Sequence, residues 1–263
     1  MTEPIGRVLV IGATGSVGRL VGRRLLALGH QPRALTRDID RARRVLDPGT
    51  DVVVGDLTDP AMLVAALDDI SAVVMTHGAP YGSGDYEDID YGAVPAVLQA
   101  LGGRTVRLVL MSSIGVTGSG GSSRDLLDWK RRGERLLRAS GVPFTIVRPG
   151  WFDAGSGREQ HVDLRQGDRT GYGPVRREHV AEVLVQALRT PNAVSKTVEV
   201  FSTDGAPVSD WDAAFAAATP DHPGALDGAQ DSPGAPFDHE PARFQTDRRR
   251  LGTVNSRNEE EVS

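Results

Sequence analysis

Three glycines that follow an apolar run near the start of the sequence have the spacing of a phosphate-binding turn. Residues 8–11 are apolar, Gly12, Gly15 and Gly18 come next, and a helix pattern follows. A strand that turns through glycines into a helix leaves unpaired backbone amides at the helix N-terminus, where a pyrophosphate can bind. Gly12 allows the tight turn, Gly15 lets the backbone approach the phosphate, and Gly18 lets the helix pack against the sheet. The pattern predicts a dinucleotide-binding turn made of Gly12, Thr14, Gly15, Ser16, Val17 and Gly18.

The end of the second predicted strand bears on which dinucleotide would bind. An acidic side chain there bonds the ribose hydroxyls of NAD, whereas the 2′-phosphate of NADP needs a cation. This strand ends in Thr36 and Arg37. A guanidinium holds a phosphate through two parallel hydrogen bonds and stacks on adenine, so Arg37 predicts NADP(H) as the cofactor. If Asp38 faces the ribose instead, the preference becomes NAD(H) or mixed.

Length, composition and charge narrow the class of protein. A chain of 263 residues, 39% of them apolar, can bury a full core as one domain with a small appendage. The absence of cysteine excludes disulfides, thiol nucleophiles and thiolate metal sites. Because no signal sequence or 18-residue apolar run is present, we expect a cytoplasmic protein without membrane contact. A net charge of −5 gives no electrostatic reason to expect nucleic-acid binding.

Strand and helix patterns alternate over the first 150 residues. Such alternation predicts an α/β fold, a Rossmann-type doubly wound parallel sheet joined by right-handed crossovers. Ligands gather at the carboxyl ends of the strands in a sheet of this kind, so residues 1–150 are predicted to be the NAD(P)-binding core. We expect strands at residues 7–11, 31–36, 51–54, 72–76, 104–111 and 144–147, and helices at residues 61–67, 90–101 and 126–140.

The pattern changes beyond residue 150. We expect residues 151–219 to form a small substrate-facing lobe that is one structural unit with the core, with strands near 169–172 and 197–201 and helices near 177–188 and 210–218. Residues 220–263 are rich in proline, glycine and aspartate and contain few apolar residues. This composition predicts a disordered tail, with binding to a protein partner as the alternative.

Several further motifs resemble a known family. They lie at residues 55–59, 90–92, 111–116, 129–130 with Glu134, and 145–150. Together with the glycine turn, they are similar to the short-chain dehydrogenase/reductase superfamily, specifically its atypical, NmrA-like NAD(P)H-binding branch, over roughly residues 5–203. The resemblance implies that Asp56 and Leu57 hold the adenine, that Thr76, His77 and Gly78 line the cofactor, and that Pro149 and Gly150 border the nicotinamide.

Reductases of this superfamily combine a serine, a tyrosine and a lysine. The resemblance assigns the serine position, which polarises the substrate oxygen, to Ser113, with Ser112 as the alternative. It assigns the lysine position, which binds the nicotinamide ribose, to Lys130. The tyrosine would stand one helical turn before the lysine, where this chain has Leu126, so the usual proton donor is missing. Other groups near the fourth strand that could supply the proton are Tyr81, Asp85 and Tyr86.

The sequence therefore predicts an NADPH-dependent oxidoreductase that transfers hydride to a small carbonyl, quinone or conjugated acceptor. A conjugated acceptor can take its proton from water, so loss of the tyrosine does not abolish turnover. The alternatives are a non-catalytic NADP(H)-sensing regulator of the NmrA type and a sugar-nucleotide epimerase. No metal site is expected, because His161 and His179 lack a carboxylate at metal spacing. The apolar wall of the substrate pocket is assigned to Tyr81, Tyr86, Trp151 and Phe152.

Overall fold

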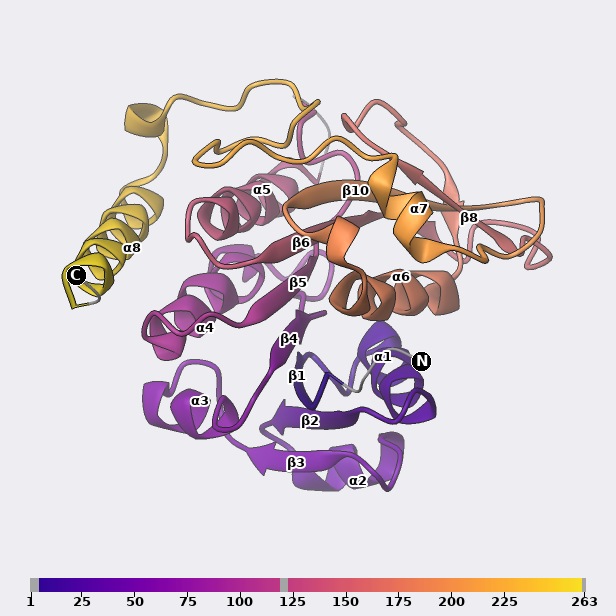
Figure 1. The fold of residues 1–263 in the computed structure, drawn as a ribbon, viewed down its shortest axis with the longest axis horizontal. Coiled ribbons are helices and arrows are strands. Elements are labelled where there is room, and N and C mark those ends of the chain that lie inside the picture. Colours follow the sequence, from indigo (N-terminus) through magenta and orange to yellow (C-terminus); the bar gives the residue numbers. More distant parts are fainter. Residues whose placement is uncertain (1–4, 119–122, 262–263) are drawn as a thin grey trace.

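The computed structural model describes residues 5–118 and 123–261, which form a sheet of eight strands with helices on both faces (Figure 1). The strand order is β3-β2-β1-β4-β5-β6-β10-β8, and β8 alone among these runs antiparallel to its neighbour. A second, two-stranded sheet pairs β7 with β9. The strands are β1 (Arg7–Ile11), β2 (Gln31–Thr36), β3 (Asp51–Val54), β4 (Ala72–Met75), β5 (Arg107–Met111), β6 (Phe144–Pro149), β7 (Trp151–Phe152), β8 (His161–Arg165), β9 (Pro174–Val175) and β10 (Lys196–Thr203).

The helices divide between the two faces of the sheet. On one face α1 packs against α6, and on the other lie α3, α4 and α5, with α8 outside them (Figure 1). Two helices have aspartate caps, because Asp38 and Asp59 each accept backbone hydrogen bonds at the start of α2 and α3. The helices are α1 (Ser16–Ala27), α2 (Ile39–Val45), α3 (Pro60–Ala66), η1 (Glu87–Tyr91), α4 (Ala93–Leu101), α5 (Arg124–Arg138), α6 (Arg177–Arg189), η2 (Pro191–Ala193), α7 (Trp211–Ala216), η3 (Phe237–His239) and α8 (Ala242–Glu261).

The predicted Rossmann-type fold is confirmed, with local corrections. Residues 169–172, predicted to be a strand, form a loop between β8 and β9. Residues 151–219 contribute β10 and β8 to the main sheet, so most of the expected substrate lobe is an extension of the core. Among the described residues, no helix combines the length and the hydrophobicity needed to cross a bilayer.

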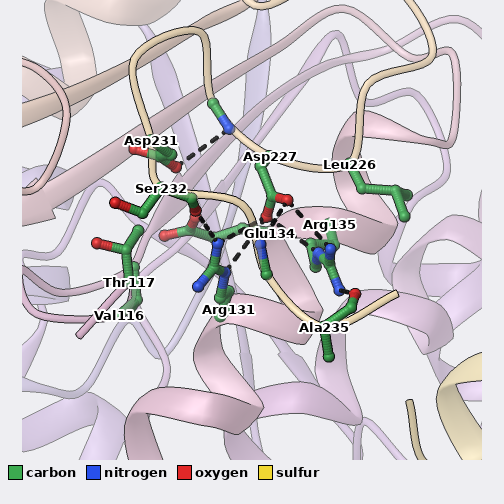
Figure 2. Close-up of polar contacts among 12 residues, drawn as sticks. Val116, Thr117, Arg131, Glu134, Arg135, Leu226, Asp227, Asp231, Ser232 and Ala235 are labelled. Atoms are coloured by element: carbon green, nitrogen blue, oxygen red, sulfur yellow. Dashed lines mark hydrogen bonds and ion pairs between the residues drawn. The ribbon is translucent and has the colours of Figure 1, made fainter. Parts of the chain in front are cut away.

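The prediction of disorder from residue 220 onward is wrong for the part of the tail whose side chains the structure describes. Phe244 is fully buried, and Asp221 and Glu240 are buried as well. Asp227 accepts hydrogen bonds from Arg131 and Arg135 of α5 (Figure 2). The segment lacks apolar runs, but Phe244 and Leu251 of α8 join the hydrophobic core, and the carboxylates of the segment pair with arginines of the core, so apolar contacts and ion pairs together hold it in place.

Candidate functional site

The glycine-rich turn between β1 and α1 has no room for side chains. Gly12 has a φ of +81°, and a Cβ there would lie 2.8 Å from the backbone nitrogen of His77. A Cβ at Gly18 would lie 2.2 Å from the carbonyl oxygen of Gly12. Gly15 is the N-cap of α1, and no side chain caps the helix. The first amides of α1 are therefore available to an anion, and this cradle fits the pyrophosphate of a dinucleotide.

The carboxyl ends of β1, β2, β3 and β4 border one cleft with a volume of about 1380 Å³. Val17 is buried, so its side chain packs in the core and only its backbone faces the turn. The side of the cleft formed by α8, which includes Arg243 and Arg250, was missed by sequence reasoning because the tail was predicted to be disordered. The cleft is lined by nine residues that the sequence assigns to the cofactor, namely Gly12, Thr14, Gly15, Arg37, Asp56, Leu57, Thr76, His77 and Gly78.

Arg37 lies at the mouth of this cleft. Its side chain is 81% exposed, and its Nη1 lies 3.6 Å from Oδ2 of Asp56. Hydrogen bonds from the backbone and the hydroxyl of Thr58 lower the pKa of Asp56, and the charge of Arg37 lowers it further. Asp38, the acidic alternative for ribose binding, instead accepts the backbone N–H of Arg41 at 2.8 Å and caps α2. At and just after the end of β2, the cleft is lined by Thr36, Arg37 and Arg41, of which the two arginines are cations.

A buried ion pair lies beneath the turn that follows β4. Nζ of Lys130 is 2.7 Å from Oδ1 of Asp90, whose side chain is completely buried, while that of Lys130 is 13% exposed. The other carboxylate oxygen of Asp90 accepts the backbone N–H of Ala79 at 3.1 Å. A Cβ at Gly78 would lie 3.4 Å from Asp90 Oδ1 and 3.9 Å from Lys130 Nζ. The absence of a side chain at Gly78 therefore keeps the pair close to the cleft.

His77 lies in the same turn and is neutral at physiological pH. Burial, and then the charge of Lys130, lower the pKa of His77 to about 4. Its Nε2 lies 3.3 Å from the carbonyl oxygen of Asp90, so in the neutral ring Nε2 carries the proton and donates to that oxygen. His77 thus links the cofactor-lining turn to the backbone of Asp90. Sequence reasoning noted the motif at residues 90–92 but assigned no role to Asp90.

The loop that carries Ser113 is held from across the sheet. Oγ of Ser113 donates to the carbonyl oxygen of Ile114 at 3.0 Å, while Ser112 is buried beneath it. The carboxylate of Asp168 accepts the backbone N–H groups of Gly115 at 2.6 Å and Thr117 at 2.7 Å. Asp168, which the sequence did not single out, therefore fixes the backbone on the carboxyl-terminal side of Ser113.

The aromatic residues predicted to form the substrate wall separate into two groups. Trp151, Phe152 and Tyr81 are exposed, and Trp151 stacks against Tyr172 with ring centroids 6.1 Å apart. Tyr86 is buried instead, and its hydroxyl accepts the backbone N–H of Gly82 at 2.6 Å, so it stabilises its own loop. Tyr172 extends the exposed group, and no motif in the sequence points to it.

Local packing accounts for three further positions that the sequence analysis named. Leu126, where the usual tyrosine would stand, packs against the hydrophobic core. Pro149 ends β6, and a Cβ at Gly150 would lie 2.3 Å from the carbonyl oxygen of Gly173, so Gly150 is required for the approach of β9. Within the described residues, no group of three or more histidine or acidic side chains is arranged to hold a metal ion.

Comparisons with known proteins agree with this geometry. A family model described as NAD(P)H-binding matches residues 12–191. Sanguinarine reductase from Eschscholzia californica is 27% identical over 262 residues, covering 81% of this chain and 96% of that protein. An uncharacterized chloroplastic protein from Arabidopsis thaliana is 30% identical over 233 residues, covering 80% of this chain and 81% of that protein. A solved structure from Bacillus halodurans, described as a candidate NAD-dependent epimerase/dehydratase, has a TM-score of 0.69 and 27% identity and covers 76% of this chain and 95% of that chain.

Proposed function

The chain belongs to the NAD(P)H-binding family, within the atypical short-chain dehydrogenase/reductase superfamily, and from this premise we propose that it is an NADP(H)-dependent reductase of a small carbonyl, quinone or conjugated acceptor. The observation that carries the proposal is the position of the buried Asp90–Lys130 pair beneath Gly78, in a turn that lines the same cleft as the glycine cradle. The likeness to a protein named sanguinarine reductase supports a reductase rather than an epimerase.

The residues of the chain divide the work between binding and proton supply. The amides of the glycine turn bind the pyrophosphate, and Arg37 binds the 2′-phosphate of NADP(H). Lys130, held by Asp90, binds the nicotinamide ribose and presents a positive charge where negative charge develops on the reduced acceptor. Ser113 donates a hydrogen bond to the acceptor oxygen. The dinucleotide, when bound, supplies the hydride.

The proton source differs from that of the usual tyrosine enzymes. His77 is neutral near pH 7, because its pKa is about 4, and its Nε2–H is committed to the backbone of Asp90. The remaining groups are the ammonium of Lys130, the exposed Tyr81 and Asp85 of the loop after β4, and water. We therefore expect acceptors whose reduced form is a stabilised anion, since these need a proton only after hydride transfer.

The second candidate function is a sensor that binds NADP(H) without turnover. The observation in its favour is that Leu126 is a partly buried side chain packed against the core, so the helical turn before Lys130 serves packing and contributes no acid. Both candidates require cofactor binding, and they differ in whether any acceptor is reduced.

The test is oxidation of NADPH, followed by absorbance, with a panel of quinones, aldehydes and enones. Ser113→Ala and the paired variant Asp90→Asn/Lys130→Met should each lower kcat by about 10²- to 10⁴-fold. The paired variant removes both charges, so no unpaired charge is left buried. Arg44→Ala, which changes an exposed cation of α2, is the control and should match the wild type. Binding of NADPH without oxidation by any acceptor would favour the sensor, and absence of binding would contradict both functions.

A further inference from the structure

Arg177, the first residue of α6, contacts the glycine-rich turn from a distant part of the chain. Its Nε donates a hydrogen bond to Oγ of Ser16 at 3.2 Å, although the two residues are 161 positions apart. Ser16 is the first residue of α1, where the pyrophosphate is expected. This contact follows from the packing of α6 beside α1 on one face of the sheet (Figure 1).

Two further contacts hold the guanidinium in place. Its Cζ lies 4.7 Å from the centroid of the Phe152 ring, which is within the range of a cation–π interaction. Asp153, which follows β7, forms an ion pair with Nη1 of Arg177. Arg177 therefore joins the start of α1 to Phe152, one of the residues assigned to the substrate wall.

The charge at this position favours an anion between the groups. The N-terminus of a helix carries a partial positive charge, so a cation beside it is unfavourable unless an anion is present. α1 has no acidic residue in its first turn and no side-chain cap, and Arg177 stands beside its first residue. Arg177 is also at the start of α6, where no side chain caps the helix and Glu178 stands in the first turn. Two helix N-termini and a guanidinium thus converge, and Asp153 is the acidic group paired with Arg177.

We propose that Arg177 is a phosphate-binding residue of the cofactor site, which holds the pyrophosphate of the dinucleotide together with Ser16 and the first amides of α1. This inference rests on the proposed function, because it names a residue of the same site. A guanidinium presents two parallel N–H donors to phosphate oxygens, and Phe152 and Asp153 limit the rotation of the side chain before the ligand arrives. The same contacts connect the pyrophosphate to the substrate wall.

The test compares two ligands and two neighbouring arginines by isothermal titration. Arg177→Gln should weaken binding of NADP⁺ by about 10- to 100-fold, since a charged hydrogen-bond donor is lost. The same variant should bind 2′-phosphoadenosine, which has no pyrophosphate, as the wild type does. Arg176→Gln is the matched control, because the Arg176 side chain instead contacts the carbonyl oxygen of Glu159 and the carboxylate of Glu178.

The outcomes separate this inference from the proposed function. If the wild type binds neither NADP⁺ nor NAD⁺, the proposed function fails and Arg177 falls with it. If the wild type binds and Arg177→Gln matches Arg176→Gln, or loses 2′-phosphoadenosine equally, only the inference is overturned. If circular dichroism shows that Arg177→Gln does not fold, the binding of NADP⁺ is measured for Arg177→Lys and Asp153→Asn instead. Weaker NADP⁺ binding in the first and binding at least as tight as the wild type in the second support the inference, and any other pair of results overturns it.

Discussion

Residues 7–18 and residues 220–251 both contribute to the cofactor cleft, but they are held by different interactions. In the first region the structure depends on the absence of side chains, because a Cβ at Gly12 or Gly18 would overlap backbone atoms. In the second it depends on long charged side chains that reach across the molecule. Asp231 accepts two hydrogen bonds from Arg148, at 2.8 and 2.6 Å, and Glu134 accepts from the same guanidinium at 2.9 and 2.6 Å.

From this difference we expect the glycine turn to set the affinity for the cofactor and the tail to set the stability of the fold. The glycine turn is short and local, so its changes should act mainly on cofactor binding. The tail is joined to the core through α5 and β6, and the charged side chains of Arg148 and Glu134 are completely buried. The attraction within a buried ion pair offsets the cost of desolvation only when every partner is present, so changes in this network should act mainly on folding.

The largest effect should come from acid, which removes several of these charges together. Burial alone would raise the pKa values of Glu134, Asp227 and Asp231, but hydrogen bonds and arginine charges outweigh it and hold them below their ordinary values. The unfolded chain therefore binds more protons below about pH 4.5, so these carboxylates stabilise the fold above that pH and lose their contribution as the pH falls. For three carboxylates the slope reaches at most about 4 kcal/mol per pH unit.

Hydrogen exchange at pH 6, 4 and 3 measures the loss of this stabilisation in each part of the chain. Residues 220–251 should lose protection before β1 and β2 do, because the N-terminal strands are held by backbone bonds and apolar contacts. In Asp227→Asn the slope of stability against pH should decrease by about a third, since one carboxylate in three is gone. Uniform loss of protection over the whole sheet would contradict the comparison.

The next largest effect on stability is expected from a single replacement in the same network of buried ion pairs. Arg148→Met leaves Glu134 and Asp231 with Arg138 as the arginine near both, at 3.1 and 4.0 Å, and breaking a buried pair in this way costs about 3–5 kcal/mol. Urea denaturation followed by circular dichroism measures the free energy of unfolding. Arg43→Met, which removes an exposed pair with Asp40, is the control and should change it by less than about 1 kcal/mol. Equal effects of the two variants would show that the buried network does not hold the tail.

The sequence predicts the first region well and the second poorly, for a physical reason. The turn at Gly12, Gly15 and Gly18 is encoded by neighbours in the chain, so spacing alone reveals it. The bond between Arg138 and Asp221 joins residues 83 positions apart, and that between Arg135 and Asp227 joins residues 92 apart. Composition shows that the tail has few apolar residues, but it does not show that arginines elsewhere pair with its carboxylates.

The residues of the candidate site also divide into those that the sequence predicts and those that it does not. The positions of Arg37, Asp56 and His77 along the cleft follow from the strand pattern, because the carboxyl ends of parallel strands meet at one edge. The partner of Lys130 does not, since Asp90 reaches it from η1, 40 residues earlier. Tyr86 was assigned to the substrate wall because it is aromatic and follows β4. Only the structure shows that its hydroxyl is bonded to the backbone of Gly82.

A smaller effect is expected from adding one methyl group to the glycine turn. Gly18→Ala places a Cβ 2.2 Å from the carbonyl oxygen of Gly12, so the turn or α1 must shift, at a cost of about 1–3 kcal/mol. The shift moves the amides that bind pyrophosphate, so NADP⁺ affinity should fall as well. Gly22→Ala in the same helix is the matched control, because nothing lies within 4 Å of its added Cβ. That variant should gain up to about 1 kcal/mol, since alanine favours helix.

The smallest expected effect concerns cofactor choice. Arg37→Gln should lower the ratio of NADP⁺ to NAD⁺ affinity about tenfold, near 1.4 kcal/mol, if the guanidinium holds the 2′-phosphate as we propose, since solvent and salt weaken a contact made by so exposed a side chain. Asp38 should not replace it, because its carboxylate caps α2. Titration of both coenzymes against the variant measures the ratio, and Arg44→Gln on the exposed side of α2 is the control. An unchanged ratio would show that Arg37 does not set the preference, and the cations left to test would be Arg41 beside it and Arg243 and Arg250 of α8, which line the same cleft.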